Sequence, residues 1–125
     1  MDFLFVAAGG AIGAGLRYAA VLCVNAHIKT EFPLAVFAVN VAGAFAIGFA
    51  ANVFAAHAAL HQHRLFIVTG LLGGWTTFST YALETVQLFQ KGAAGLAVAY
   101  VIASNLLCFL FVLAGMFLSR LILSK

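Results

Sequence analysis

Four long apolar runs constrain this chain more than any other feature of its sequence. They cover about residues 3–25, 34–56, 65–89 and 94–118. Each run can cross a hydrocarbon layer of about 30 Å, which takes roughly 20 residues of α-helix. The chain is 66% hydrophobic and only 7% charged, whereas a soluble domain is about 25% charged. The sequence therefore predicts an all-α integral membrane protein with four transmembrane helices, as a single domain over residues 1–125.

The runs have the character of helices that stay in the membrane. None alternates apolar and polar positions as the strands of a β-barrel do. We do not expect the first run to be a signal peptide, because Asp2 stands where a basic region belongs and three more runs follow. Cys23 and Cys108 both lie inside runs, so we expect no disulfide framework.

The third run is interrupted at its middle. From Gly70 to Tyr81 it reads Gly-Leu-Leu-Gly-Gly-Trp-Thr-Thr-Phe-Ser-Thr-Tyr. Adjacent glycines weaken a helix, and hydroxyl side chains compete for its backbone hydrogen bonds. Backbone groups freed at membrane depth are tolerated only where they are buried in protein or line a wet cavity. The sequence therefore predicts that the third helix is broken at mid-membrane, with polar groups facing something polar.

Basic residues flank the runs almost evenly. If the N-terminus and residues 57–64 share one side of the membrane, that side carries Arg64, Arg120 and Lys125, whereas the other carries Lys29 and Lys91, with Arg17 just inside the first run. Such a balance gives almost no orientation bias. Insertion in both directions allows an antiparallel, dual-topology homodimer, which is a two-fold arrangement.

Three polar side chains inside the runs each have two interpretations. Arg17 either extends to the nearby interface or attracts an anion into a wet vestibule. Asn40 either joins helices or donates its N–H groups to an anion. Glu84 follows the interruption by one or two turns and is either hydrated or functional. The sequence by itself leaves these alternatives open.

The remaining polar residues point mainly to packing. Tyr100, Ser104 and Cys108 recur every four residues and share one helix face, which is either interhelical contact or one wall of a polar track. Asn105 lies beside that face, and we assign it to packing. We also assign the glycines of the first run to close helix packing. For His57 and the histidines that follow it, a solvated loop is favoured over a metal site.

The polar groups in the runs are mostly hydrogen-bond donors. Amides, hydroxyls and one guanidinium can replace the water around a small anion, and aromatic edges are electropositive. Carbonyls released around Gly73 to Thr76 can coordinate a small cation, as the ends of broken helices do in transporters. No paired nucleophile and base, phosphate loop or metal quartet is visible in the sequence. We therefore expect a path for a small anion, no enzyme activity and no nucleic-acid partner.

The stretch from Gly73 to Glu84, Gly-Gly-Trp-Thr-Thr-Phe-Ser-Thr-Tyr-Ala-Leu-Glu, resembles the third-helix signature of the Fluc (CrcB) fluoride channels. Three further features match in order and spacing. They are Gly-x-x-Gly-x-x-x-Arg ending at Arg17, Val-Asn-Val-x-Gly around Asn40, and the face of Tyr100 and Ser104. The resemblance covers essentially the whole chain.

The resemblance implies a fluoride-selective channel that exports fluoride passively and relieves its toxicity, in a bacterial-type inner membrane. It implies an antiparallel homodimer with two pores and a structural Na⁺ at the dimer interface, held by the backbone carbonyls of Gly73 and Thr76. It implies a fluoride path along Asn40, Phe78, Ser79, Thr80, Tyr81, Tyr100 and Ser104. It places Glu84 near a pore end, and we group Glu84 with Arg17 as vestibule or gating residues.

Three positions depart from the family pattern. Tyr81 stands where the family usually has Phe, so its added hydroxyl either donates to fluoride or obstructs the path. Cys108 stands where Ser or Thr is frequent, and a thiol is a weaker donor. Trp75 replaces a smaller apolar residue, and we expect it to face lipid or the partner subunit.

Two other classes of membrane protein compete with a channel. A small multidrug-type transporter also has four spans and dual topology, but its proton coupling needs a carboxylate deep in the first span. The first run has none, and its only charge is Arg17. A non-conducting membrane scaffold explains the glycines but not the hydroxyl-rich interruption.

Overall fold

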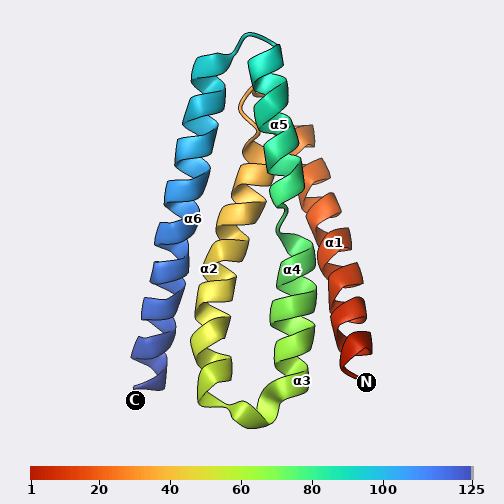
Figure 1. Ribbon diagram of the computed structural model, residues 1–125, viewed down its shortest axis with the longest axis vertical. Helices are drawn as coiled ribbons and strands as arrows, with labels where there is room; N and C mark the ends of the chain where they lie inside the picture. Colours follow the sequence, from red (N-terminus) through yellow and green to blue (C-terminus); the bar gives the residue numbers. More distant parts are fainter. Residues whose placement is uncertain (125) are drawn as a thin grey trace.

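The structure is a computed structural model that describes residues 1–124, apart from the side chain of Ala58. Lys125, which the sequence places on the side of the N-terminus, lies outside the described residues. Helices α1, α2 and α6 and the segment of residues 61–90 lie side by side and alternate in direction (Figure 1). Both chain ends therefore lie at the same end of the molecule, the lower end in Figure 1.

Three of the predicted spans form single long helices. They are α1 (Asp2–His27), α2 (Leu34–Ala56) and α6 (Ala94–Leu123). Within the described part of the chain, these three helices are long and apolar enough to cross a membrane. The second matches its predicted range, 34–56, and Pro33 stands at its N-cap, where the missing N–H of proline does no harm. The fourth extends five residues beyond the predicted 118 before it ends at Leu123.

The third predicted span is divided into two arms. After a short 3₁₀ turn, Ala58–Leu60, the lower arm runs through α3 (His61–Arg64), the π-helix η2 (Leu65–Leu72) and α4 (Gly73–Trp75). The upper arm is α5 (Phe78–Gln90). Thr76 and Thr77 between them are extended, with ψ of 155° and 116°. The break that the sequence predicted is therefore present, and it lies near the middle of the molecule (Figure 1).

The upper arm ends in a tight reversal into α6. Gly92 has a φ of +79°, a conformation that glycine adopts without the penalty that a Cβ brings. The N–H of Gly92 is donated to Phe89 O at 3.0 Å, and that of Ala93 to Leu88 O at 2.9 Å. This pattern closes the last carbonyls of α5 and brings α6 down beside it.

Glycines bring the helices together in two pairs. On α1, a Cβ at Gly9 would collide with the Phe66 carbonyl, and one at Gly13 with the Leu71 carbonyl, so α1 packs backbone to backbone against the lower arm. A Cβ at Gly48 of α2 would likewise collide with α6. Small residues permit such close approach in membranes. The packing role expected for the glycines of α1 is confirmed at Gly9 and Gly13, whereas a Cβ at Gly15 would meet nothing within 4 Å.

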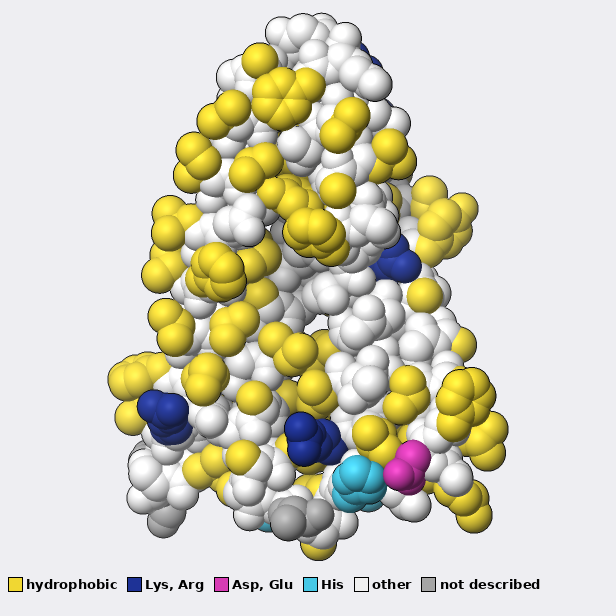
Figure 2. All heavy atoms as spheres, viewed as in Figure 1, with side chains coloured by type: hydrophobic (Ala, Val, Ile, Leu, Met, Phe, Trp, Pro, Cys, Tyr) yellow, Lys and Arg dark blue, Asp and Glu magenta, His cyan; other side chains and the backbone are white. Residues whose placement is uncertain are grey.

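Large apolar side chains cover much of the outer surface. Phe3 is 81% exposed and Phe109 is 69% exposed. One cluster of buried apolar residues lies near the upper end and comprises Val36, Tyr81, Leu88, Ala97 and Tyr100. Figure 2 shows apolar side chains along this face, whereas charged and histidine side chains gather mainly at its lower end. Such a surface suits lipid rather than water around its middle.

Candidate functional site

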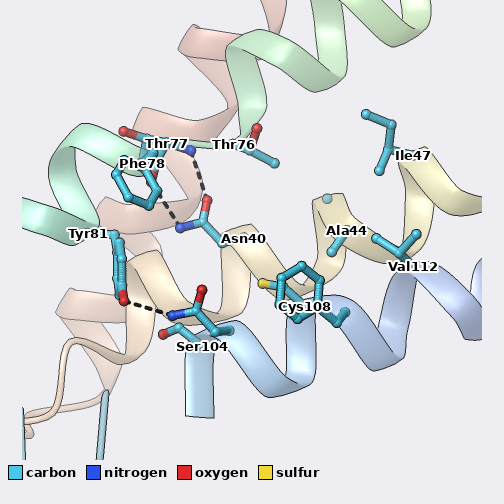
Figure 3. Close-up of a pocket in the computed structure, with 13 residues that line it drawn as sticks. Asn40, Ala44, Ile47, Thr76, Thr77, Phe78, Tyr81, Ser104, Cys108 and Val112 are labelled. Atoms are coloured by element: carbon cyan, nitrogen blue, oxygen red, sulfur yellow. Dashed lines mark hydrogen bonds between the residues drawn. The ribbon is translucent and has the colours of Figure 1, made fainter. Parts of the chain in front are cut away.

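The break between the two arms is held open by Asn40 of α2. The Asn40 Oδ1 atom accepts the Thr77 N–H at 2.8 Å, and its Nδ2 donates to Thr77 O at 3.0 Å. Figure 3 shows this amide reaching from α2 to the backbone at Thr77. One side chain therefore satisfies both backbone groups of Thr77, which an uninterrupted helix would satisfy along its own axis. The helix-joining interpretation of Asn40 is the one seen here, and the second N–H of Nδ2 remains for the cavity.

Two carbonyls lose their helical donors because of this arrangement. In a continuous helix the Thr77 N–H would be donated to Gly73 O, and the Thr80 N–H to Thr76 O. Instead, the Thr77 N–H goes to Asn40, and the Thr80 N–H goes to the Thr77 hydroxyl at 3.3 Å, which caps α5. Gly73 and Thr76 are the two residues that the resemblance links to a cation. Their carbonyls are thus released from helical pairing, as cation coordination requires.

Arg17 of α1 contacts the break directly. Its Nε donates to the Gly74 carbonyl at 3.1 Å, which is another carbonyl near the break. Arg17 also lines a cavity of about 260 Å³ on the α1 side of the break. Thr80 and Glu84 line the same cavity. The structure therefore brings together the two residues grouped as a vestibule, Arg17 and Glu84, and adds Thr80 to them.

Trp75 was expected to face lipid or the partner subunit, and the structure shows that much of it packs within its own subunit. Its indole N–H is donated to Val39 O of α2 at 2.8 Å, and its ring packs against Gly43, where a Cβ would lie 2.9 Å from Trp75 Cδ1. The side chain is half-buried within its own subunit rather than turned to lipid. The physical reason is that an indole N–H at membrane depth requires an acceptor, and Gly43 leaves the room to reach one.

A second cavity opens on the other side of the break, between α2, α5 and α6. It has a volume of about 300 Å³, and Figure 3 shows the side chains around it. Its polar and aromatic lining includes Asn40, Thr76, Phe78, Tyr81, Ser104, Asn105 and Cys108. Thr77 lines both this cavity and the vestibule on the α1 side. Four predicted path residues, Asn40, Phe78, Tyr81 and Ser104, are therefore brought together here.

Five aromatic rings form a ladder that starts at this cavity. Ring centroids are 5.4 Å apart for Phe78 and Tyr81, 5.1 Å for Tyr81 and Tyr100, and 5.3 Å for Tyr100 and Phe32. Phe37 continues the ladder at 5.3 Å from Phe32. Most of these contacts are edge-on, which is the favoured arrangement of ring quadrupoles. Tyr100 is wholly buried in it, whereas Phe78, at the cavity end, is 76% exposed.

Hydroxyl groups follow the same course beside the ladder. The Tyr100 hydroxyl donates to Glu84 Oε2 at 2.8 Å, so these two predicted residues are linked although only Glu84 lines a cavity. The hydroxyl of Thr77 donates to that of Thr80 at 3.0 Å. Ser79 is exposed and lines neither cavity, although its hydroxyl lies 3.4 Å from that of Thr77.

Two hydroxyl groups on the cavity wall lack acceptors among the described residues. Ser104 is 7% exposed, and its Oγ has no hydrogen-bond partner there. The Tyr81 oxygen accepts from Asn105 Nδ2 at 3.0 Å, and within the described chain its own proton goes to no acceptor. An unpaired buried hydroxyl is costly. The cavity therefore offers donated protons in excess of the acceptors that the protein supplies.

Sequence reasoning missed Asn105 and the seat of Trp75. Asn105 was assigned to packing, yet it contacts Tyr81 and lines the cavity. Its position next to Ser104 on α6 was the one signal available.

The expected solvated loop is exposed at His57 and His61, and His61 Nε2 lies 3.3 Å from Asp2 Oδ2. Among the described residues no group of three or more metal-binding side chains exists, and both cysteines are free.

The chain is similar to known proteins over nearly its whole length. Residues 4–116 match the family described as "CrcB-like protein, Camphor Resistance (CrcB)". The chain is 43% identical over 120 residues to the "Fluoride-specific ion channel FluC" of Helicobacter pylori (strain HPAG1), covering 94% of this chain and 92% of that one. It is 40% identical over 123 residues to the protein of the same name in Rhodopseudomonas palustris (strain BisB5), covering 98% and 99%. It is also 40% identical over 121 residues to "Fluoride-specific ion channel FluC 2" of Nitrobacter hamburgensis, covering 96% and 98%.

Proposed function

This chain belongs to the CrcB family, and on that premise we propose that it is a fluoride-selective channel through which fluoride leaves the cell down its gradient. The family is a class of ion channels, not of enzymes, and the apolar helices make this chain a multi-pass membrane protein. We place it in the inner membrane of a bacterial-type cell. Passive exit of fluoride through it relieves fluoride toxicity.

The observation that carries the proposal is the surplus of donated protons on the cavity wall. Ser104 Oγ has no partner, and the Tyr81 proton has no acceptor among the described residues. A small anion supplies the missing acceptor and receives hydrogen bonds in place of its hydration water. The Asn40 amide and the Arg17 guanidinium near the break are donors too, which favours an anion over a cation on this path. The 76% exposed ring of Phe78 adds an electropositive edge at the same cavity.

Passage then follows the residues that connect the two cavities. Thr77 lies between them, and Thr80, Glu84 and Arg17 face the vestibule on the α1 side. The Arg17 guanidinium draws anions into that vestibule, since opposite charge raises the local anion concentration. Sites of this kind conduct when each binds the ion weakly enough to release it to the next.

We further propose that the functional unit is an antiparallel homodimer with two pores. The cavity beside the break is open on the outer face of one subunit, where Phe78 and Phe109 are 76% and 69% exposed. A second copy in the opposite orientation covers this face, and each pore then takes aromatic side chains from both subunits. The similar numbers of basic residues on the two sides support insertion in both orientations. In the sequence they are Arg64, Arg120 and Lys125 against Lys29 and Lys91, with Arg17 just inside the first run.

A structural Na⁺ fits the released carbonyls of the break. The carbonyls of Gly73 and Thr76 have lost their helical donors, and carbonyls at the ends of broken helices coordinate sodium in transporters. Two subunits supply four such carbonyls. The ion neutralises these carbonyl dipoles and ties the two breaks together at the dimer interface.

Anion efflux from liposomes that contain the purified protein tests the channel function. We expect fast fluoride efflux and negligible chloride efflux under the same gradient. Failure to release fluoride would leave the scaffold alternative standing. Proton-driven efflux of an organic cation would instead indicate a multidrug-type transporter. We do not expect that result, because this chain has no carboxylate between Phe3 and Asn25 to exchange protons.

Two measurements test the assembly. The mass of the protein in detergent is expected to be that of two chains. A reporter fused to the C-terminus is expected on both sides of the membrane in comparable amounts. A monomer, or one orientation only, would contradict the antiparallel dimer without affecting the efflux result.

A further inference from the structure

We propose that Asn105 is a positioning residue for Tyr81, which it holds so that the phenolic proton is donated into the cavity, to fluoride in passage. This inference rests on the proposed channel function. The contact joins two helices, because Tyr81 lies on α5 and Asn105 on α6. Figure 3 shows the Tyr81 hydroxyl on the cavity wall beside the α6 side chains that include Ser104.

The direction of the hydrogen bond follows from a second contact of the same amide. Asn105 Nδ2 lies 2.8 Å from the carbonyl oxygen of Val101 and 3.0 Å from the Tyr81 hydroxyl oxygen. A carbonyl oxygen only accepts hydrogen bonds, so the amide atom beside it must be the nitrogen. The Val101 carbonyl thus fixes the orientation of the amide, and its second N–H is presented to Tyr81.

The consequence for Tyr81 is that its proton must go elsewhere. An amide nitrogen does not accept a hydrogen bond, so the phenol cannot return its proton to Asn105. The neighbouring hydroxyl, Ser104 Oγ, has no partner among the described residues. Asn105 therefore occupies a lone pair of the phenol and leaves its O–H as a donor without a protein acceptor.

The ring of Tyr81 is held at the same time. It packs between Phe78, at 5.4 Å, and Tyr100, at 5.1 Å, and Tyr81 is only 9% exposed. With the ring fixed, the hydroxyl proton has one remaining freedom, rotation about the C–O bond. The Asn105 N–H limits that rotation, because the proton avoids the donor that faces the oxygen.

The role of Asn105 depends on the hydroxyl group of Tyr81. A phenylalanine at position 81, which is usual in the family that the chain resembles, has no oxygen to accept the Asn105 N–H. Asn105 thus serves position 81 only when a tyrosine stands there. If Asn105 acts through Tyr81, substitutions at the two positions must be non-additive.

The test is a double-mutant cycle on fluoride binding. The half-saturating fluoride concentration is measured from channel currents in planar bilayers for the unmodified protein, Tyr81→Phe, Asn105→Leu and the double variant. We expect Tyr81→Phe to raise it about tenfold, because the change removes a hydrogen bond donated to an anion. We expect Asn105→Leu to raise it by up to the same factor, because the phenol keeps its proton but loses the contact that fixes the direction of donation. We expect the double variant to match Tyr81→Phe, because Asn105 then has no phenol to position.

A spectroscopic readout separates positioning from a merely structural role. Infrared difference spectra with isotope-labelled tyrosine report the phenol C–O vibration on addition of fluoride. The unmodified protein is expected to show a fluoride-dependent shift, which Tyr81→Phe abolishes and Asn105→Leu alters. Asn52→Leu is the matched control, since Asn52 also donates to a carbonyl of α6, that of Met116 at 2.8 Å, but lines neither cavity. That control is expected to leave half-saturation unchanged.

The outcomes distinguish this inference from the proposed function. If the unmodified protein conducts fluoride but Asn105→Leu has no effect, the positioning role is overturned and the channel stands. If Asn105→Leu still weakens binding in the Tyr81→Phe background, Asn105 acts independently of Tyr81, and the inference is likewise overturned. If the unmodified protein conducts no fluoride, both the function and the inference fail.

Discussion

Helix α2 carries two asparagines that reach a neighbouring element, and their surroundings differ. Asn52 donates to Met116 O at 2.8 Å and to Ser119 Oγ at 2.9 Å, and the Ser119 hydroxyl donates to Met116 O at 2.9 Å. Every proton that these two side chains can donate is used. Asn40, in contrast, pairs with the Thr77 backbone beside a cavity whose wall retains the unpaired Ser104 hydroxyl.

The contrast teaches how one helix serves two purposes. Around Asn52 the α2–α6 contact is closed, since Gly48 and Gly115 bring the two backbones together and every donated proton has an acceptor. Around Asn40 the backbone of the neighbouring segment is held apart, and donors remain unpaired. A polar contact in which every donor has an acceptor stabilises the fold, whereas one with unpaired donors can bind a ligand. We interpret the Asn52 region as the scaffold and the Asn40 region as the site.

The largest expected effect is the loss of fluoride efflux when a carboxylate replaces Asn40, compared with the same replacement at Asn52. Asn40→Asp removes the donor to Thr77 O and places negative charge beside the anion path. Like charges about 4 Å apart in a partly buried site repel by about 4 kcal/mol, so we expect fluoride efflux to fall at least about 100-fold. Asn52→Asp is the control, and its efflux per folded dimer should be unchanged. Normal conduction by Asn40→Asp would reduce Asn40 to a packing role.

The next largest effect tests the closed region. A Cβ at Gly48 would lie 2.9 Å from Val112 Cα and collide with its carbonyl oxygen, whereas one at Gly15 meets nothing within 4 Å. We expect Gly48→Ala to lower the free energy of unfolding by about 1–3 kcal/mol through overpacking. We expect Gly15→Ala to lower it by no more than about 0.5 kcal/mol. Unfolding in detergent, followed by fluorescence of the single tryptophan, measures both. Equal stabilities would show that the α2–α6 contact yields easily.

The helices and the break were predictable because their causes are local. Long apolar runs predict helices wherever they occur, and Gly73-Gly74 with the following threonines predicts the interruption. The interruption falls at Thr76 and Thr77, which are extended, and the hydroxyl of Thr77 caps the helix that follows. These signals need no knowledge of how one helix faces another.

The partners of the polar side chains were not predictable, because they depend on helix rotation. Trp75 was expected to face lipid or the partner subunit, but its indole N–H is donated to Val39 O because Gly43 lies on the α2 face that meets the break. Asn105 was assigned to packing because it lies beside the face of Tyr100 and Ser104. In the structure Asn105 contacts the Tyr81 hydroxyl instead, because the packing of α6 against α5 decides which α6 side chains meet α5. A single sequence contains no record of that packing.

A smaller effect is expected at the exposed end of the aromatic ladder. Phe78→Ile replaces an electropositive ring edge with an aliphatic surface beside the cavity, and aromatic contacts of this kind are worth about 0.5–1.5 kcal/mol. We expect fluoride efflux to fall up to about tenfold while the dimer stays intact. Phe3→Ile is the control, because Phe3 is 81% exposed on α1 and lines neither cavity. Equal efflux from both variants would remove Phe78 from the path.

The smallest expected effect joins Asn40 to the sodium proposal. Sodium at a few times its dissociation constant should stabilise the dimer by about 1 kcal/mol, and potassium should do so less. Asn40→Leu releases the Thr77 N–H, which can then return to the Gly73 carbonyl and withdraw one of the proposed sodium ligands. We therefore expect the sodium response of Asn40→Leu to be lost and that of Asn52→Leu to be retained, both measured as the shift of thermal unfolding in sodium against potassium. A response that survives in Asn40→Leu would place any bound sodium away from the break, because the carbonyl at Gly73 is available only while Asn40 holds Thr77.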